Sequence, residues 1–414
     1  MSKVKHTELS EQGKERIAWV SEHMPVLRGI GEWFEKKKPL KGLNVGMCLH
    51  VEPKTCVLAL TLKKAGADVA IAGCNPLSTQ DDAASALSKM GVEVFAWHGQ
   101  NEQEYVENIN KVIDSKPNIL IDDGADVIAM LHEKRTDALP EIIGACEETT
   151  TGIHRIMAME KDGVLTFPVM AVNEAYTKHM FDNRYGTGQS VVDGILKATN
   201  LSLAGKTATV AGYGWCGKGV ASRLSGMGCN IIVTELDSIK ALEAKMDGYR
   251  VMKLEKALEE SDIVVTVTGN KHVIGKAHIS HIKNGAILAN AGHFDIEIDK
   301  QALAKESIRQ RQVKEEVEIY ELKNGKKVYL LSQGRLVNLA AGQGHPAEIM
   351  DMSFAVQAMS AEYLSKERDS LKPKVYPIPI EIDRAIANLK LKSMGVEIDE
   401  LTNDQAQYLK SWRI

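Results

Sequence analysis

The stretch KTATVAGYGWCGKGVASRLSGMGCNIIVTE, residues 206–235, decides the fold of this chain. It opens with an apolar, β-branched run, Thr207–Ala211, and closes with a second such run, Ile231–Thr234, each of which predicts a buried strand. A glycine-rich turn and a helical segment lie between the two runs. This order of strand, turn, helix and strand predicts a βαβ unit with parallel strands.

The glycines of this stretch match the spacing G-x-G-x-x-G at Gly212, Gly214 and Gly217. In a dinucleotide-binding unit the first glycine makes the tight turn, the second lets backbone approach a pyrophosphate, and the third lets helix pack on strand. Glu235 follows the second strand, where an acid accepts the ribose hydroxyls and repels a 2′-phosphate, so we expect NAD rather than NADP. Two alternatives stay open: a tight turn without a ligand, and a phosphate contact from Lys240 that weakens the NAD preference.

Composition bounds the partners of the chain. Its 414 residues carry a net charge of −4 and a pI near 6.3, which gives no electrostatic basis for binding nucleic acid or an anionic membrane. No apolar run approaches the roughly 18 residues of a membrane span, and the charged, amphipathic helix expected over residues 1–20 lacks a signal-peptide core. The six cysteines show no C-x-x-C motif and no metal-ligand spacing. We therefore expect reduced thiols, no metal, a cytoplasmic location and small-molecule partners.

Strands and helices alternate along the rest of the chain. Before the glycine turn, strands are expected at Leu43–Leu49, Asp68–Ala72, Val92–Trp97 and Asn118–Asp122, and helices at Thr55–Ala65, Asp81–Met90 and Glu102–Ile113. After it, strands are expected at Ile263–Thr268, Ala286–Ala289 and Lys327–Leu331, and a helix at Pro346–Leu364, followed by the Pro-rich segment KPKVYPIPIEID. Repeated strand–helix units with buried Val, Ile and Leu predict the α/β class, with two doubly wound, Rossmann-like domains.

The order of these elements predicts that one domain is inserted into the other. Residues 1–183 and 345–377 form the expected substrate-binding domain, and residues 184–344 form the expected NAD-binding Rossmann domain. Residues 378–414 form a C-terminal helical tail. A ligand cleft is expected where the two domains meet.

Polar clusters follow the expected strands, at the edge where an open α/β sheet binds its ligand. They are LHVEPKT (49–55), CNPLSTQDD (74–82), IDDGAD (121–126), EETTTG (147–152), TKHMFDNRYGTGQS (177–190), NAGHFDIEID (290–299) and NLAAGQGHP (338–346). Singly, each has a structural explanation. Asp122 and Asp123 suit a helix cap, residues 149–151 suit an N-cap run, and residues 182–183 suit a turn.

Together, in this order, the clusters resemble the adenosylhomocysteinase family. The strings EETTTG, FDNRYG, GYGWCGKG, GHFD and NL…GHP carry the resemblance, which runs from about His23 to Leu409 and is of an archaeal type. It implies reversible hydrolysis of an S-nucleosylhomocysteine thioether by a homotetramer with tightly bound NAD. Oxidation of the 3′-hydroxyl to a ketone makes the C4′ proton acidic, homocysteine leaves by elimination, water adds, and the ketone is reduced again. The competing class is an ordinary NAD-dependent dehydrogenase with a split substrate domain.

The resemblance also implies roles for individual residues. Lys178 and Asp182 act on the 3′-hydroxyl, the lysine having a pKa lowered by the cationic nicotinamide, and Asp123 is the C4′ base. His50 and His293 carry protons for the leaving thiol and the attacking water, because imidazole titrates near neutral pH. The expected binding residues are Glu148 at the 2′-hydroxyl, Asn183 beside the nicotinamide, Thr149, Thr150, Thr151 and Asn338 at the dinucleotide, and His345 at the base end and gate.

The sequence departs from the family pattern at the expected base site. Where relatives usually have a threonine facing purine N1 and an acid or amide facing the 6-amino group, this chain has Glu52 and Lys54. Glu52 suits the N1–H of hypoxanthine and Lys54 suits its O6, whereas adenine would set its amino group against an ammonium at a cost of about 1–3 kcal/mol. We therefore expect S-inosylhomocysteine as substrate. Alternatively, Glu52 and Lys54 pair with each other, or a shifted adenine satisfies both. A second departure is Thr187, where relatives commonly have cysteine.

Overall fold

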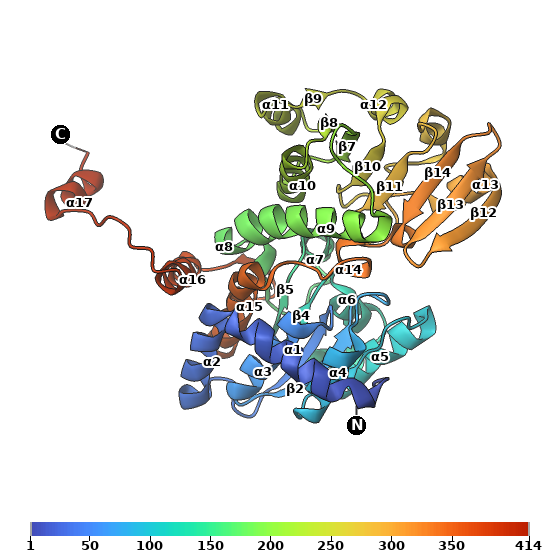
Figure 1. Ribbon diagram of the computed structural model, residues 1–414. Helices are drawn as coiled ribbons and strands as arrows, with labels where there is room; N and C mark the ends of the chain where they lie inside the picture. The colour runs from blue at the N-terminus through green and yellow to red at the C-terminus, as the bar shows by residue number, and fades with distance from the viewer. Residues whose placement is uncertain (1, 413–414) are drawn as a thin grey trace.

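The computed structural model describes residues 2–412 and contains two β-sheets, each covered by helices (Figure 1). The first sheet has seven strands in the order β15-β6-β5-β4-β1-β2-β3, and all of its strand pairs are parallel. Its strands are β1 (Asn44–Leu49), β2 (Asp68–Gly73), β3 (Glu93–Phe95), β4 (Ile119–Asp122), β5 (Gly144–Glu147), β6 (Val169–Ala171) and β15 (Val375–Pro377). Its helices are α1 (Ser10–Glu22), α2 (Pro25–Lys37), α3 (Pro53–Lys64), α4 (Asp81–Lys89), α5 (Glu102–Asp114), α6 (Asp126–Glu133) and α7 (Thr150–Lys161).

The second sheet has eight strands in the order β12-β13-β14-β11-β10-β7-β8-β9. The strands from β14 to β9 run parallel, and β12 and β13 add an antiparallel edge. Its strands are β7 (Thr207–Ala211), β8 (Asn230–Thr234), β9 (Arg250–Val251), β10 (Ile263–Thr266), β11 (Ile287–Asn290), β12 (Ser307–Lys314), β13 (Val317–Leu322) and β14 (Lys327–Leu331). Its helices are α10 (Trp215–Gly226), α11 (Ser238–Met246), α12 (Leu254–Glu260) and α13 (Lys300–Lys305).

The chain crosses between the sheets twice. It leaves the first through α8 (Tyr176–Lys178), the π-helical segment η4 (His179–Gly186) and α9 (Thr187–Thr199). It returns through α14 (Val337–Ala340) to α15 (Ala347–Glu367), a largely buried helix that packs against the first unit, and then to edge strand β15. The second unit is therefore inserted between two parts of the first.

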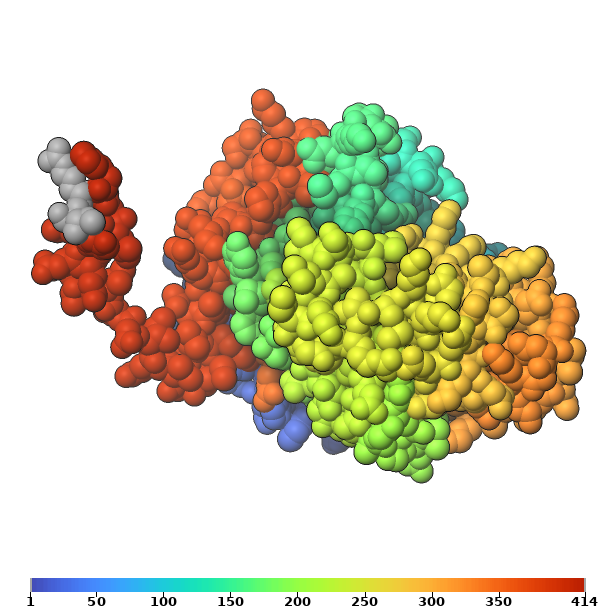
Figure 2. Space-filling view, turned by 90° about the horizontal axis from the view of Figure 1, so that it is seen from above, coloured from blue at the N-terminus to red at the C-terminus, as the bar shows by residue number. Residues whose placement is uncertain are grey.

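Two helices follow β15. They are α16 (Ile380–Ser393) and α17 (Asn403–Lys410). Figures 1 and 2 show α17 standing clear of the body on an extended segment. The last two residues of the expected tail, 413–414, lie outside the described residues.

The predicted α/β class with two doubly wound sheets is confirmed, whereas several predicted elements need correction. The expected strand Val92–Trp97 is only the three residues of β3, and residues 2–9 lie outside the N-terminal α-helix. The Pro-rich segment, to which the sequence assigned no element, contributes β15. Within residues 2–412, every helix is too short or too polar to serve as a membrane span.

Candidate active site

A cavity of about 1230 Å³ lies between the two units, at the carboxyl ends of their strands. His50, Asp123 and Glu148 enter it directly after β1, β4 and β5, because neighbouring parallel strands end at one sheet edge. Of the residues expected at the site from the sequence, all but Gly217 line this cavity. The structure therefore brings together clusters that lie up to about three hundred positions apart in the chain.

The glycine turn between β7 and α10 has the geometry that the sequence predicts. Gly212 has φ +107°, and a Cβ on Gly217 would lie 2.0 Å from the carbonyl oxygen of Gly212, so neither position accepts a larger residue without strain. A Cβ on Gly214 would meet no atom within 4 Å, which means that its backbone faces open space. A pyrophosphate fits at this place, in front of the first turn of α10.

Glu235 lies at the end of β8, beside the glycine turn. Its Oε2 accepts a 2.7 Å hydrogen bond from the backbone N–H of Tyr213, and its Oε1 accepts one of 2.7 Å from Leu236. These bonds fix the carboxylate at the cavity wall. Lys240 is exposed and also borders the cavity.

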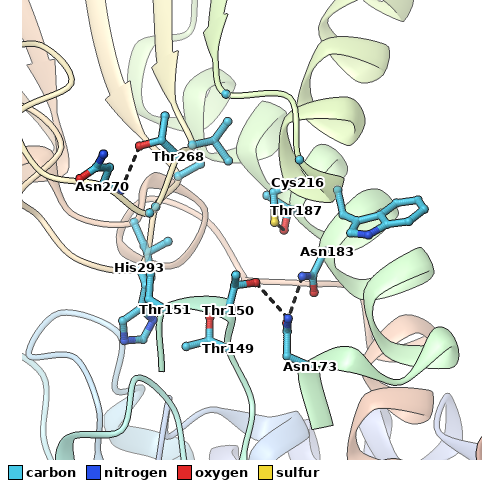
Figure 3. A pocket seen from close by; sticks show the side chains of 18 of the residues that line it. Thr149, Thr150, Thr151, Asn173, Asn183, Thr187, Cys216, Thr268, Asn270 and His293 are labelled. Atoms are coloured by element: carbon cyan, nitrogen blue, oxygen red, sulfur yellow. Dashed lines mark hydrogen bonds between the residues drawn. The ribbon is translucent and has the colours of Figure 1, made fainter. Parts of the chain in front are cut away.

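Two buried polar atoms in the cavity wall are free to bind a ligand. Thr151 Oγ1 and Asn338 Oδ1 have no hydrogen-bond partner among residues 2–412, although buried polar groups are normally paired. Figure 3 shows Thr149, Thr150 and Thr151 on the same side of the cavity, with the hydroxyl of Thr150 accepting a 2.9 Å bond from Asn173 Nδ2. The open Gly214 backbone and these unpaired atoms fit a dinucleotide lying across the cavity.

Lys178 lies at the centre of a buried polar cluster. Its Nζ donates to Asn183 Oδ1 at 2.8 Å and to Asn173 Oδ1 at 3.2 Å, and it pairs with Asp182 at 3.2 Å and Glu148 at 3.5 Å. Burial lowers the pKa of Lys178, but the two carboxylates outweigh it and leave this pKa raised. The lowering expected from a cationic nicotinamide is a separate effect, which would act against these two carboxylates once NAD is bound.

The pKa values of Asp182 and Glu148 are shifted in opposite directions although both side chains are buried. Burial raises the pKa of Asp182, but Lys178 and His345 overcome this effect and hold it below its usual value; Ser353 Oγ also donates to Asp182 at 2.9 Å. Glu148 has fewer compensating partners, and burial raises its pKa to about 7 even though Gln357 donates to it.

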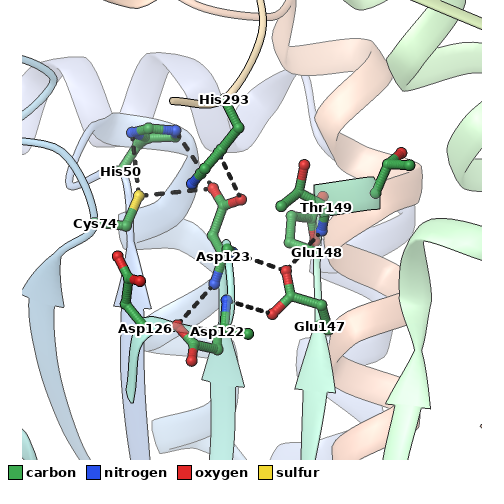
Figure 4. Close-up of polar contacts among 12 residues, drawn as sticks. His50, Cys74, Asp122, Asp123, Asp126, Glu147, Glu148, Thr149 and His293 are labelled. Carbon is green, nitrogen blue, oxygen red and sulfur yellow. Dashed lines mark hydrogen bonds and ion pairs between the residues drawn. The ribbon is translucent and has the colours of Figure 1, made fainter. Parts of the chain in front are cut away.

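A second polar cluster surrounds Asp123 (Figure 4). His50 Nε2 lies 3.3 Å from Asp123 Oδ2, and His293 Nδ1 lies 3.5 Å from Asp123 Oδ1. The thiol of Cys74 lies 3.3 Å from His50 Nδ1 and 3.6 Å from Asp123 Oδ2. Both histidines therefore meet the one carboxylate expected to act as the carbon base.

Burial lowers the pKa of His50 to about 4. This differs from the expectation that His50 titrates near neutral pH, because the desolvation of the charged ring outweighs its attraction to Asp123. Ser78 Oγ lies 2.7 Å from His50 Nδ1 and donates to the carbonyl oxygen of Asn75 at 3.1 Å. The hydroxyl thus accepts from Nδ1–H, which assigns the neutral His50 a free lone pair on Nε2, facing Asp123.

Glu52 and Lys54 form an ion pair of 2.6 Å in the cavity wall. The alternative that they pair with each other is what the structure shows. Glu52 is also the N-cap of α3, accepting from the backbone N–H of Thr55 at 3.2 Å and of Lys54 at 3.1 Å. Lys54 Nζ donates further to the carbonyl oxygen of Gln343, at 3.0 Å.

Several residues at the site had no assigned role from the sequence. They are Cys74, Ser78, Asn173, Cys216, Ser353 and Gln357. Ser353 and Gln357, four apart in the apolar run of α15, carried a signal, since polar residues on one face of a buried helix need partners. Thr187 Oγ1 donates to Cys216 Sγ at 3.6 Å. A thiol therefore lies beside position 187, where the family resemblance predicts cysteine and this chain has threonine.

Asp122 has the structural role that its position allows. Its carboxylate accepts from the backbone N–H groups of Asp123 and Ile128, both at 3.0 Å, and so caps α6. Glu147 likewise accepts from the N–H groups of Gly124 and Ala125. These two acids hold the loop that presents Asp123.

Comparison with known proteins agrees with this geometry. Residues 1–141 match the family model for S-adenosyl-L-homocysteine hydrolase, and residues 183–344 match the model for its NAD binding domain. The chain is 59% identical over 413 residues to the S-inosyl-L-homocysteine hydrolase of Methanocaldococcus jannaschii, covering 100% of this chain and 99% of that protein. It is 56% identical to the S-inosyl-L-homocysteine hydrolase of Methanothermobacter thermautotrophicus, covering 99% and 98%. It is 55% identical to the adenosylhomocysteinase of Saccharolobus solfataricus, covering 99% of both. The chain therefore belongs to the S-adenosyl-L-homocysteine hydrolase family, and its inserted unit binds NAD.

Proposed function

We propose that this enzyme hydrolyses S-inosyl-L-homocysteine to inosine and L-homocysteine, reversibly. The observation that carries the choice of base is the Glu52–Lys54 pair in the cavity wall. Overall identity does not decide it, because the reported relatives of the two names lie close together, at 59% and 56% for S-inosyl-L-homocysteine hydrolases and 55% for an adenosylhomocysteinase.

Lys54 has one donor left for a base. An ammonium carries three N–H groups, and Lys54 uses one on Glu52 and one on Gln343. The third suits O6 of hypoxanthine, which is an acceptor. Adenine has an amino donor at this position, so its binding in the same pose would set two donors against each other.

Glu52 must exchange one partner to receive the base. A carboxylate has about four lone-pair sites, and Glu52 already accepts from Lys54 N, Lys54 Nζ, Thr55 N and Thr55 Oγ1. The bond from the Thr55 hydroxyl is the longest, at 3.3 Å. We infer that the N1–H of hypoxanthine displaces this hydroxyl.

The cluster around Lys178 holds the sugar for oxidation. When bound, NAD supplies reversible hydride transfer at the 3′ carbon, which makes the neighbouring C4′ proton acidic. When the cationic nicotinamide lies beside it and lowers its pKa, Lys178, held by Asp182 and Asn183, receives and returns the proton of the 3′-hydroxyl. Glu148 accepts from the 2′-hydroxyl. Thr149, Thr150, Thr151, Asn338 and Glu235 are proposed dinucleotide contacts, with His345 at the gate.

The cluster around Asp123 carries out elimination and hydration. Asp123 takes the C4′ proton, and the C5′–S bond breaks as the sulfur leaves with a proton from His293. In the second half, water adds to C5′, the proton that it gives up restores His293, and Asp123 returns its proton to C4′. His50 is neutral at working pH, and its free Nε2 accepts a hydrogen bond from that water.

The test is a side-by-side measurement of kcat/KM with S-inosyl- and S-adenosylhomocysteine, using the NAD-loaded enzyme. We expect a preference for the inosyl substrate of about ten- to hundredfold, from one mismatched buried polar pair. Equal values of kcat/KM, or a preference for the adenosyl substrate, would contradict the proposal that Glu52 and Lys54 select hypoxanthine. The family assignment would not be affected.

We further propose that the enzyme is a cytoplasmic homotetramer with the division into domains expected from the sequence: residues 1–183 with 345–377, residues 184–344, and residues 378–414. The tail from α16 to α17 supports self-association, because it projects from the body with exposed apolar side chains. These are Leu389, Met394, Val396, Ile398, Leu401, Tyr408 and Leu409. Analytical ultracentrifugation of the full chain and of a chain ending at residue 395 tests this: the first should be a tetramer, and the second should dissociate.

A further inference from the structure

The carbonyl oxygen that holds Lys54 belongs to the loop by which the chain returns from the inserted unit. Lys54 Nζ donates to the backbone oxygen of Gln343 at 3.0 Å, and Gln343 is an exposed residue between α14 and α15. A glycine flanks it on each side, and Gly344 has a φ of +71°, which glycine adopts without strain. Because the neighbouring glycines add no side-chain packing, the position of this carbonyl oxygen depends on the contacts of the Gln343 side chain.

Arg16, on α1, connects this loop to the rest of the first unit. Its Nη2 donates to Gln343 Oε1 at 3.2 Å and also to the side chain of Gln80. Its Nη1 donates to Asp82 Oδ2 at 2.7 Å, and the Asp82 carboxylate is buried at the start of α4, so this bond is charge-assisted and fixes the guanidinium. A guanidinium presents its N–H groups in one rigid plane, which an ammonium cannot do. Arg16 thus joins three segments of the chain through one planar group.

Lys54 borders free space on two sides. A second cavity, of about 830 Å³, shares Glu52, Lys54 and His345 with the cavity that contains the proposed base site. Arg16 and Gln343 form part of the wall of this second cavity. An ammonium held by Glu52 alone could turn its other N–H groups toward either cavity, because the lysine side chain rotates about several bonds. The bond to the carbonyl oxygen of Gln343 removes this freedom.

We propose that Arg16 is a positioning residue for base selection: by holding the side chain of Gln343, it fixes the carbonyl oxygen that aims Lys54 Nζ at O6 of hypoxanthine. This role rests on the proposed preference for the inosyl substrate and deepens it. Arg16 is not part of the wall of the larger cavity, so it acts through Gln343 and does not touch the base. Loss of the contact leaves Lys54 free to turn, and the ammonium then distinguishes O6 from an amino group less well.

Gln343→Ala isolates the contact, because it removes the acceptor side chain, keeps the backbone oxygen and leaves the pair of Arg16 and Asp82 intact. Arg16→Lys is the second variant, which keeps a positive charge facing Asp82 but lacks the planar group that also reaches Gln343. Each variant should lower the ratio of kcat/KM for S-inosyl- to S-adenosylhomocysteine about three- to tenfold in the NAD-loaded enzyme, the range expected for one hydrogen bond. The change should lie in KM for the inosyl substrate and not in kcat, because the contact to the base is made in the ground state as well as in the transition state.

Two controls test whether the effect passes through Lys54. Lys14→Gln, on the same helix as Arg16, breaks an exposed pair with Glu11 of 2.8 Å and should leave the ratio unchanged. In a Lys54→Met enzyme, the addition of Gln343→Ala should not change the ratio further, since no ammonium remains to be positioned. Melting curves of all variants show whether the fold is kept.

A folded Gln343→Ala or Arg16→Lys enzyme that keeps the wild-type preference would overturn the positioning role and leave the proposed substrate intact. A lower melting temperature with an unchanged ratio would likewise mean that Arg16 only joins α1 to α4. A further fall in the ratio when Gln343→Ala is added to Lys54→Met would also overturn the role, because the effect would then not pass through the ammonium. A wild-type enzyme without a preference for the inosyl substrate would overturn base selection by Lys54, and the role of Arg16 with it.

Discussion

Replacing Lys54 with methionine tests base selection most directly, since methionine keeps most of the length and removes the three donors. Lys54 Nζ contacts Glu52 at 2.6 Å and Gln343 at 3.0 Å, and its third N–H is assigned to O6 of the base. A hydrogen bond from a charged group contributes about 1.5–3 kcal/mol. Its loss should lower kcat/KM for S-inosylhomocysteine roughly 10- to 150-fold. The value of kcat/KM for S-adenosylhomocysteine should fall much less, because the variant no longer sets an ammonium against the amino group of adenine.

The quantity to measure is therefore the ratio of kcat/KM for the two substrates. Lys63→Met is the matched control, because Lys63 lies on the same helix, α3, but contacts the carbonyl oxygens of Met90 and Gly91. Melting curves of both variants separate loss of specificity from loss of fold, since Lys54→Met leaves the buried Glu52 carboxylate with one partner fewer. An unchanged substrate ratio in a folded Lys54→Met enzyme would refute the reasoning.

Three other changes test separate parts of the site. Ser78→Ala removes the acceptor that orients His50 and should lower kcat about tenfold, with KM and NAD content unchanged. Ser78→Thr keeps a hydroxyl and should restore kcat. A tenfold rise in KM in Ser78→Ala would contradict a positioning role. Gly217→Ala places a Cβ 2.0 Å from the carbonyl oxygen of Gly212 and should lower the melting temperature. Gly214→Ala has open space around its Cβ, so this variant should fold normally but retain less NAD, as its melting curve and cofactor content would show. Burial raises the pKa of Glu148 from 4.5 to about 7, so its contribution to the stability of the NAD-free protein is present below pH 4.5 and lost as pH rises through about 7. Glu148→Gln should flatten this decline in urea unfolding curves, and an equally steep decline would show that Glu148 is not its source.

Local sequence patterns predict the parts of the fold that depend on few neighbours. β7 and β14 match their expected bounds because each is a short β-branched or apolar run between turn residues. β15 was not expected, since its residues form a strand only by pairing with β6, some two hundred positions earlier. The hairpin β12–β13 was also missed: β12 is mostly exposed, so it lacks a buried face from which to recognise it.

The site shows the same division between local and long-range causes. Side chains at strand ends can be located from the sequence, because parallel strands end together, and His50, Asp123 and Glu148 do meet in one cavity. The pKa values of these side chains cannot be predicted from the sequence in the same way. The pKa of His50 depends on how far its ring is desolvated in the folded protein, and that of Lys178 depends on Glu148 and Asp182, which the fold brings to its ammonium.

The π-helical segment η4 constrains the number of residues between Lys178 and Asp182 as well as their identity. Lys178 Nζ contacts Asp182 and Asn183, the residues four and five positions ahead, at 3.2 and 2.8 Å. A regular α-helix advances about 100° per residue, so it presents the fourth residue to the same face and turns the fifth away. The wider turn lets one ammonium reach both. Deleting a single residue between Lys178 and Asp182 would rotate this pair out of phase while every chemical group remained present, so insertions and deletions here should be less well tolerated than substitutions.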